Sequence, residues 1–228
     1  MELLIFLIGF FTILTVSFAS GDDGEAITDR EVVVKESGSL RKLLDGNKRF
    51  ITGNLESKDF SDTKRKELAK GQRPFAIVVA CSDSRVAPEI IFDQGLGDIF
   101  VIRVAGNVLD RVSLGSIEYA AEHLKTPLVI ILGHTYCGAV TAAVESKGRT
   151  EGNIGAIVKR ILPAVERARK EGKSSKDLVN SAIIKNVLLQ GEYMIKNSTV
   201  IRKLIKAKEL QVITAIYNLE SGEVSIVK

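Results

Sequence analysis

The stretch Phe75-Ala-Ile-Val-Val-Ala-Cys81 decides the fold. Its continuous apolar run, rich in β-branched residues, is typical of a strand that is buried on both faces of a sheet. Similar runs at 98–104 and 127–132 predict two more strands, with helical segments between them, notably 112–124. This alternation predicts a mainly parallel sheet, in which ligands bind at the carboxyl ends of the strands.

The remaining segments extend this α/β fold at both ends. Periodic apolar residues predict helices at 40–54, 61–70, 138–145, 153–171, 174–196 and 200–206, and short strands at 211–218 and 222–227. We therefore expect a central, mainly parallel β-sheet flanked by helices, with an N-terminal helical arm and C-terminal helices and short strands. With 228 residues, 45% of them hydrophobic, the chain can build one sizeable core, and 39–228 is predicted to be a single domain.

The N-terminus has a different character. Residues 3–20 form an apolar to weakly polar run that ends in small residues, and a polar linker follows at 21–38. Residues 1–20 are predicted to be a secretory signal peptide. An uncleaved membrane anchor is the alternative, because the run is nearly long enough to span a bilayer. Both interpretations predict an exported domain, periplasmic, secreted or anchored outside the cytoplasm, and membrane contact only if the segment is uncleaved.

The charge of the chain gives little indication of a partner. The formal net charge is +4, but Lys and Arg are interleaved with Asp and Glu along most of the sequence. No basic run is interleaved with aromatic residues, and no nucleic-acid-binding module is recognisable. The sequence therefore predicts a mixed, solvated surface and no nucleic-acid partner.

Two short motifs carry the chemistry of the chain: Cys81-Ser-Asp-Ser-Arg85 and His134-Thr-Tyr-Cys137. They contain both cysteines and one of the two histidines, and each of these three residues follows a predicted strand or opens a helix. Two thiolates and an imidazole are three of the four ligands of a tetrahedral zinc ion, which leaves one position open for catalysis. In an exported protein the cysteines could instead form a structural disulfide. That alternative explains neither the histidine nor the Asp83 and Arg85 pair.

Asp83 and Arg85 alternate with serines, so in an extended backbone or a tight turn both side chains can turn towards the same site as Cys81. A charge-assisted, bidentate pair between them would fix the carboxylate beside the metal. An ordinary salt bridge in a loop is the alternative.

The sequence closely resembles the β-class carbonic anhydrases, over essentially everything from about residue 40 onward. The motifs that carry the resemblance are Gln72-Arg-Pro, Cys81-Ser-Asp-Ser-Arg-Val86, Phe92-Asp-Gln-Gly-Leu-Gly-Asp98, Arg103-Val-Ala-Gly-Asn107, Ile117-Glu-Tyr-Ala120 and His134-Thr-Tyr-Cys-Gly138. Weaker agreement extends through 46–50 and 217–222.

The resemblance implies a zinc enzyme that hydrates CO2 reversibly to bicarbonate and a proton. One zinc ion per chain would be held by Cys81, His134 and Cys137, and zinc-bound hydroxide would attack CO2. Asp83 would accept a hydrogen bond from that hydroxide, and Arg85 would keep Asp83 ionised. In a closed, inactive state of some members this aspartate becomes the fourth zinc ligand. Bicarbonate-regulated members often carry a tryptophan that this chain lacks, which favours the constitutively open type.

Four further residues gain a role only through the resemblance. Gln72 would hold the substrate oxygen during catalysis, and Val86 and Phe100 would form an apolar wall for CO2. Gly138 would offer its N–H, at a helix N-terminus, to the developing negative charge on oxygen. Without the resemblance, Gln72 is a surface turn residue, and Val86 and Phe100 belong to the strand core.

Tyr119 and His123 lie one turn apart on the predicted helix 112–124, away from its apolar stripe. In a monomer they would be plain surface residues. The resemblance places them at a subunit interface, where Tyr119 lines the partner's active site and His123 passes protons to solvent. It therefore implies a homo-oligomer, either a dimer or a multiple of dimers.

Two other functions compete with CO2 hydration. A zinc hydrolase of CS2 or COS on the same scaffold would carry nearly the same motifs. A non-catalytic zinc-binding or redox protein would need a fourth ligand to close the zinc site, and only Asp83 could provide it. That last interpretation leaves Gln72 and the pairing of Asp83 with Arg85 without a purpose.

Overall fold

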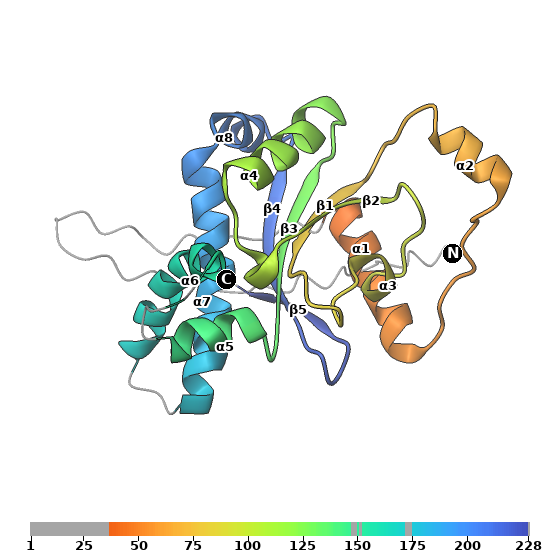
Figure 1. Cartoon of the computed structure of the whole chain (residues 1–228). Helices are drawn as coiled ribbons and strands as arrows, with labels where there is room; N and C mark the ends of the chain where they lie inside the picture. Colours follow the sequence, from red (N-terminus) through yellow and green to blue (C-terminus); the bar gives the residue numbers. More distant parts are fainter. Residues whose placement is uncertain (1–36, 147–149, 151, 172–174, 228) are drawn as a thin grey trace, which may run out of the picture.

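The computed structural model of the protein describes residues 37–146, 150, 152–171 and 175–227 (Figure 1). The predicted signal peptide or anchor at 1–20, and all but the end of the linker at 21–38, lie outside these residues. Among the helices that are described, none is long and apolar enough to cross a membrane.

In the described part of the chain, five strands form one sheet in the order β2-β1-β3-β4-β5. They are β1 (Ala76–Ala80), β2 (Ile99–Arg103), β3 (Leu128–His134), β4 (Gln211–Tyr217) and β5 (Val224–Val227). Neighbouring strands are parallel except β4 and β5, which are antiparallel. Every residue of β1 and β3 is buried, as the uninterrupted apolar runs predict. The mainly parallel sheet is therefore confirmed.

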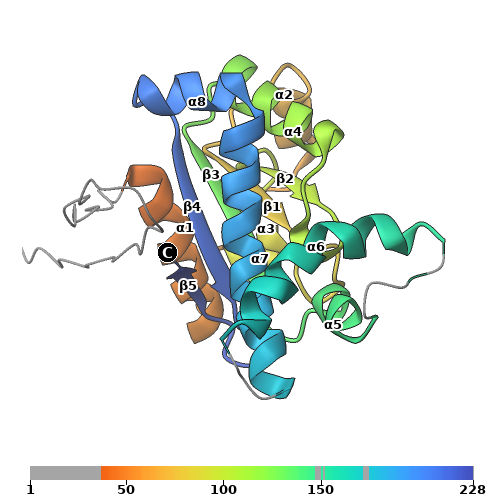
Figure 2. The ribbon, with the colours of Figure 1, turned by 90° about the vertical axis from the view of Figure 1, so that its left-hand side faces the viewer.

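Helices cover both faces of the sheet (Figure 2). They are α1 (Gly38–Thr52), α2 (Asp62–Leu68), α3 (Pro88–Ile91), α4 (Arg111–Glu118), α5 (Gly138–Glu145), α6 (Ile154–Arg169), α7 (Ser175–Asn197) and α8 (Thr199–Lys206). Alternate residues of β1 pack against different helix layers, because successive side chains of a strand point to opposite faces of the sheet. Val78 packs in the cluster that includes α1 and α3. Ile77 packs in the cluster that includes α4, α7 and α8.

A third cluster lies at the carboxyl edge of the parallel strands. There α5, α6 and the first half of α7 pack together with the side chains of Cys81 and Cys137. A capping box between Asp110 and Ser113 fixes the start of α4 on the chain that leads away from this edge. The cluster surrounds the predicted metal ligands with apolar side chains, so these ligands are shielded from water.

Three local features differ from the sequence-based expectation. The predicted helix 112–124 is α4 followed by a π-helical turn at Tyr119–His123. The Leu124 N–H reaches back to the Tyr119 carbonyl at 3.3 Å, which inserts an extra residue into the turn. Helix α3 and the 3₁₀ turn Ala105–Asn107 were not expected either. Neither is long enough to show an apolar period.

One buried side chain ties the two ends of the domain together. Asn47 of α1 is 3% exposed, and its Nδ2 donates to the carbonyls of Ile91 at 3.1 Å and Gly222 at 2.8 Å. Its Oδ1 accepts from the Val224 N–H at 2.9 Å. The first helix is thereby fixed to the hairpin that ends the sheet.

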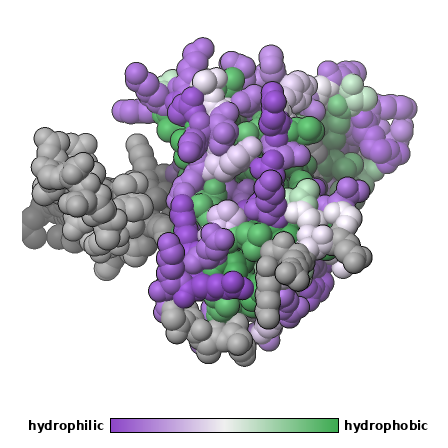
Figure 3. Space-filling view, turned by 60° about the vertical axis from the view of Figure 1, so that its left-hand side comes forward, coloured by the Kyte–Doolittle hydropathy of each residue, from purple (hydrophilic) through white to green (hydrophobic). Residues whose placement is uncertain are grey.

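The surface of the described residues is mixed, as the interleaved charges predict. Figure 3 shows a face on which hydrophilic residues predominate and hydrophobic ones form small areas between them. Near the start of β2, four large apolar side chains are exposed and line a single hollow: Leu55, Phe60, Ile90 and Leu96. Exposed apolar side chains that gather in this way are typical of an interaction surface.

Candidate metal centre

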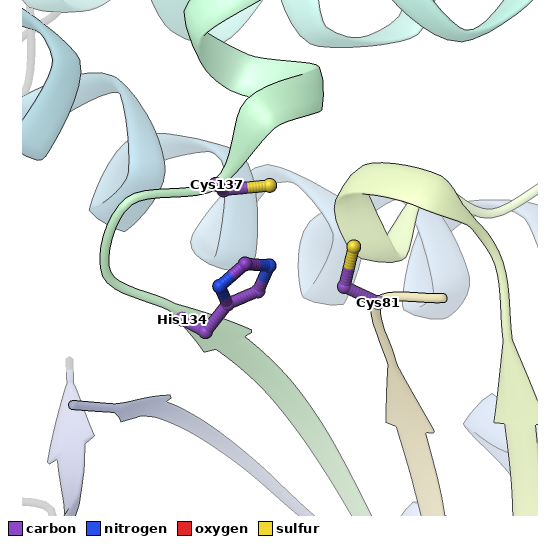
Figure 4. A group of neighbouring side chains, drawn as sticks. All are labelled: Cys81, His134 and Cys137. Atoms are coloured by element: carbon purple, nitrogen blue, oxygen red, sulfur yellow. The ribbon is translucent and has the colours of Figure 1, made fainter. Parts of the chain in front are cut away.

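The three predicted metal ligands meet at the carboxyl edge of the sheet (Figure 4). Cys81 directly follows β1, His134 is the last residue of β3, and Cys137 is the residue before α5. Their side-chain donor atoms all lie within 4.8 Å of one another. All three residues are buried, with exposed fractions of 4%, 0% and 2%. Within the described residues, this is the only group of His, Cys, Asp and Glu side chains arranged to hold a metal ion.

The tautomer of His134 follows from its neighbour. Its Nδ1 lies 2.9 Å from the Thr135 carbonyl oxygen, which can only accept a hydrogen bond. In the neutral imidazole the proton is therefore on Nδ1, which leaves the lone pair of Nε2 free. Nε2 is buried and has no hydrogen-bond partner. A buried nitrogen without a partner is costly unless it binds something else, and a metal ion satisfies it.

Both cysteines are free, and their sulfurs lie within 4.8 Å of each other. The interaction with Cys137 lowers the pKa of Cys81 well below its usual value. The same contact, together with burial, raises the pKa of Cys137. A bound cation would favour the deprotonated form of both buried sulfurs. Two thiolates and a neutral imidazole suit zinc, and three protein ligands are the number found at catalytic zinc sites.

Asp83 lies beside these ligands, with its Oδ2 3.9 Å from His134 Nε2. Arg85 holds both carboxylate oxygens: Nε donates to Oδ1 at 2.9 Å and Nη2 donates to Oδ2 at 2.8 Å. The Arg85 N–H adds a third bond to Oδ1 at 3.0 Å. The side-chain bonds from Arg85 hold the pKa of Asp83 well below its usual range. The predicted bidentate pair is therefore present next to the metal ligands.

Two residues of this edge were not singled out from the sequence, although both lie in the Arg103–Asn107 motif. Arg103 donates to the carbonyls of Cys81 at 3.1 Å and Asp83 at 2.7 Å, and so braces the segment between them. The Gly106 N–H donates to Cys81 Sγ at 3.1 Å. Their position in the sequence could have indicated this role. Both residues come at or just after the end of β2, next to the chain that leaves β1.

Val86 and Gly138 flank the ligands in different ways. Val86 is fully buried and packs with the side chains of α1 and α3, so in this structure it belongs to the core. Gly138 is the first residue of α5, directly after Cys137. A Cβ placed on it would meet no atom within 4 Å, so there is open space beside this residue.

The other predicted site residues lie elsewhere in the chain. Phe100 pairs with Ile77, which is four residues before Cys81, or about 13 Å along the strand. Gln72 precedes β1 altogether, at the opposite end of the strand from Cys81. The Tyr119 ring lies 6.4 Å from the Phe100 ring and 5.5 Å from the His123 ring. These four residues are therefore not brought to the metal ligands of the same chain.

Comparison with known proteins agrees with this site. The family model described as carbonic anhydrase matches residues 76–224. A carbonic anhydrase of Mycolicibacterium smegmatis is 40% identical over 189 residues, covering 82% of this chain and 90% of that protein. A carbonic anhydrase of Synechococcus elongatus is 33% identical over 198 residues, covering 81% of this chain and 70% of that protein.

Solved structures identify the class. A β-carbonic anhydrase of Aspergillus fumigatus matches with a TM-score of 0.67 and 30% identity, over 72% of this chain and 80% of that one. A tetrameric β-carbonic anhydrase of Sordaria macrospora matches with a TM-score of 0.66 and 27% identity, over 72% of this chain and 85% of that one. The chain belongs to the carbonic anhydrase family, in its β class.

Proposed function

We propose that the protein catalyses the reversible hydration of CO2 to bicarbonate and a proton at the metal centre. The observation that carries this proposal is the buried Cys81, His134 and Cys137 group with the paired Asp83 beside it. Zinc would be held by the two sulfurs and by His134 Nε2. When bound, it supplies a Lewis acid that makes a water molecule nucleophilic near neutral pH.

Asp83 orients that water. Because Arg85 binds both carboxylate oxygens, Asp83 stays ionised and can only accept hydrogen bonds. It therefore accepts a hydrogen bond from the attacking water, and this leaves a lone pair of the water oxygen directed at CO2. The same bidentate pair keeps Asp83 from turning onto the metal as a fourth ligand, which supports the open form of the site.

Gly138 and the apolar surroundings serve the substrate. The N–H of Gly138, at the N-terminus of α5, is placed to donate to a substrate oxygen as negative charge develops on it. The cluster that includes Val140 and Ile161 excludes bulk water from the ligands. An uncharged gas can enter such surroundings, while the charged product is released to solvent.

A second copy of the chain would complete the site. Gln72, Phe100, Tyr119 and His123 are too far from Cys81 in their own chain, and β2 is an uncovered edge strand whose residues are only partly buried. The exposed apolar side chains near its start add to this surface. In a homo-oligomer these residues would be delivered to the partner's site, where Gln72 holds the substrate oxygen and His123 passes the proton to solvent. The solved relative from Sordaria macrospora is a tetramer.

Complementation between subunits tests this arrangement. Gln72→Ala and Cys81→Ala would each be inactive as a pure protein. Mixed dimers would regain activity if Gln72 acts across the interface, because one of their two sites then has an intact Cys81 and an intact Gln72. Mixing without any recovery would show that Gln72 does not act in the partner.

We also propose that residues 1–20 direct export. The apolar run that ends in small residues supports cleavage, and its length supports anchoring as the alternative. Mass measurement of the mature protein from the producing cell tests both, because cleavage removes about 2 kDa from the N-terminus. Full-length protein found in the soluble cytoplasm would contradict export.

The activity itself is tested by stopped-flow CO2 hydration with zinc-loaded protein. We expect fast hydration that is lost when zinc is removed by a chelator and regained when zinc is restored under reducing conditions. Bound zinc without CO2 hydration would refute the proposal. Hydrolysis of CS2 or COS by the same sample would then identify the competing function.

A further inference from the structure

Helix α7 carries two buried amide side chains that no part of the proposed mechanism uses. Asn186 and Gln190 are 1% and 4% exposed. They lie one turn apart, among the buried apolar residues Ala182, Ile183 and Val187. A buried amide is costly unless its hydrogen bonds are satisfied. Both amides find their partners in the loop that follows β2.

The hydrogen bonds of these two amides run in one direction. The Leu109 N–H donates to Gln190 Oε1 at 2.9 Å, and Gln190 Nε2 donates to Asn186 Oδ1 at 3.0 Å. Asn186 Nδ2 then donates to the Gly106 carbonyl at 2.8 Å. A backbone N–H can only donate and a backbone carbonyl can only accept. The two ends therefore fix the orientation of both amides.

The turn that receives this hydrogen bond has an unusual backbone. Gly106 has φ 66, which glycine adopts readily, and Asn107 has φ 45, in the left-handed region that most other residues avoid. That conformation at a non-glycine residue persists only where the surroundings hold it. A Cβ on Gly106 would lie 2.7 Å from Ile161 Cδ1, so the turn is also closely packed. Its contact with the metal centre is the Gly106 N–H, which donates to Cys81 Sγ at 3.1 Å.

We propose that Asn186, oriented by Gln190, is a positioning residue of the metal centre. It holds the turn at Gly106 and Asn107 in place, so that the Gly106 N–H stays directed at Cys81 Sγ and fixes that sulfur as a metal donor. Groups that hydrogen-bond to metal ligands typically change metal affinity about 10- to 100-fold when removed. This inference rests on the zinc site proposed above, and it adds an outer support that comes from α7.

Zinc affinity tests the role of Asn186 without relying on activity. Zinc dissociation constants are measured by competition with a chromophoric chelator, for the wild type, Asn186→Ala and Ser181→Ala. Ser181 is a matched control: it is also buried on α7, but it donates to Glu171 at 2.8 Å and does not contact the turn. We expect Asn186→Ala to bind zinc about 10-fold more weakly, at the lower end of that range because Asn186 acts through Gly106, and Ser181→Ala to bind like the wild type. Unchanged affinity in Asn186→Ala, or an equal loss in both variants, would overturn the inference.

A second variant and a spectrum cover the case in which Asn186→Ala does not fold. Gln190→Met keeps the size of the side chain and removes its amide, so that Asn186 loses the donor that orients it and the Leu109 N–H loses its acceptor. In cobalt-substituted protein, we expect its thiolate-to-cobalt charge-transfer band at longer wavelength than in the wild type, because a sulfur with a weaker hydrogen bond holds its electrons less tightly. An identical band would overturn the inference. If the wild type binds zinc and hydrates CO2, and the variants behave like the wild type, only the role of Asn186 is refuted. A wild type that binds no zinc refutes the proposed function as well.

Discussion

Asp83→Asn replaces one oxygen of a carboxylate by an NH2 group and keeps the size of the side chain. In the protein, Oδ1 accepts two hydrogen bonds from Arg85, and Oδ2 accepts the third from Nη2 at 2.8 Å. An asparagine that keeps its oxygen in the first position must turn its NH2 group towards Nη2, so that one donor faces another. The variant therefore loses the charge-assisted bond and the negative charge beside the metal ligands.

With its NH2 group in the second position, the asparagine cannot accept a hydrogen bond from the attacking water there, and this lost bond sets the size of the effect on activity. A hydrogen bond to a charged group contributes about 1.5–3 kcal/mol. If this contribution is made in the transition state, kcat/KM falls about 10- to 150-fold, at about 1.4 kcal/mol per factor of ten. Stability should change little, because the Arg85 side chain is 55% exposed and exposed ion pairs contribute at most about 1 kcal/mol.

Three measurements on each variant separate these effects: stopped-flow CO2 hydration, bound zinc per chain, and unfolding in urea. The matched control is Ser84→Ala, an exposed neighbour in the same motif, for which we expect the activity of the wild type. Zinc content and stability should be the same in both variants. If zinc-loaded Asp83→Asn is as active as Ser84→Ala, the assignment of Asp83 as the orienting carboxylate is wrong.

Three further predictions concern stability and metal loss. Asn47→Ala leaves buried backbone groups without their three hydrogen bonds and should lower the free energy of unfolding in urea by about 3 kcal/mol or more; a loss under about 1 kcal/mol would contradict this. Zinc-free protein kept in air should form a disulfide between Cys81 and Cys137 and regain zinc only after reduction, so full recovery with zinc alone would argue against it. Burial alone would raise the pKa of Asp93, but hydrogen bonds, first among them that from Arg49, lower it overall. Its ionised form therefore stabilises the fold above about pH 4, and this contribution is lost as pH falls further. The stability difference between wild type and Asp93→Asn should shrink below that pH in urea titrations, and a constant difference down to pH 2 would refute the assignment.

The sheet could be predicted from the sequence because its central strands are buried on both faces. The run that contains Ile77 and Val78 has no polar residue to solvate, so only a strand between two layers accommodates it. The 3₁₀ turn at Ala105–Asn107 could not be predicted in the same way. Its conformation depends on partners in α6 and α7 that are far away in the sequence, and three residues show no period. The π-turn at Tyr119–His123 was missed because its apolar spacing still fits a regular helix.

The metal ligands could be predicted because the local sequence places them. Cys81 and His134 each follow a buried run, and parallel strands bring their carboxyl ends to one edge. The supports of that edge could not be predicted, since Asn186 meets Gly106 across 80 residues of sequence. The sequence does contain one indication of these supports, which is a pair of amides one turn apart within the apolar face of α7. Such a pattern indicates a buried polar contact, although not its partner.

The tie between α1 and the last hairpin has a consequence for how the chain is made. The partners of Asn47 in α1 include Gly222 and Val224, which the ribosome adds 175 and 177 residues later. Until then, the first helix of the domain has no complete surface on which to pack, and the growing chain cannot close this layer of its core. This layer therefore closes only after Val224 has been made. If residues 1–20 do direct export, this delay keeps the precursor loose enough to be threaded across a membrane.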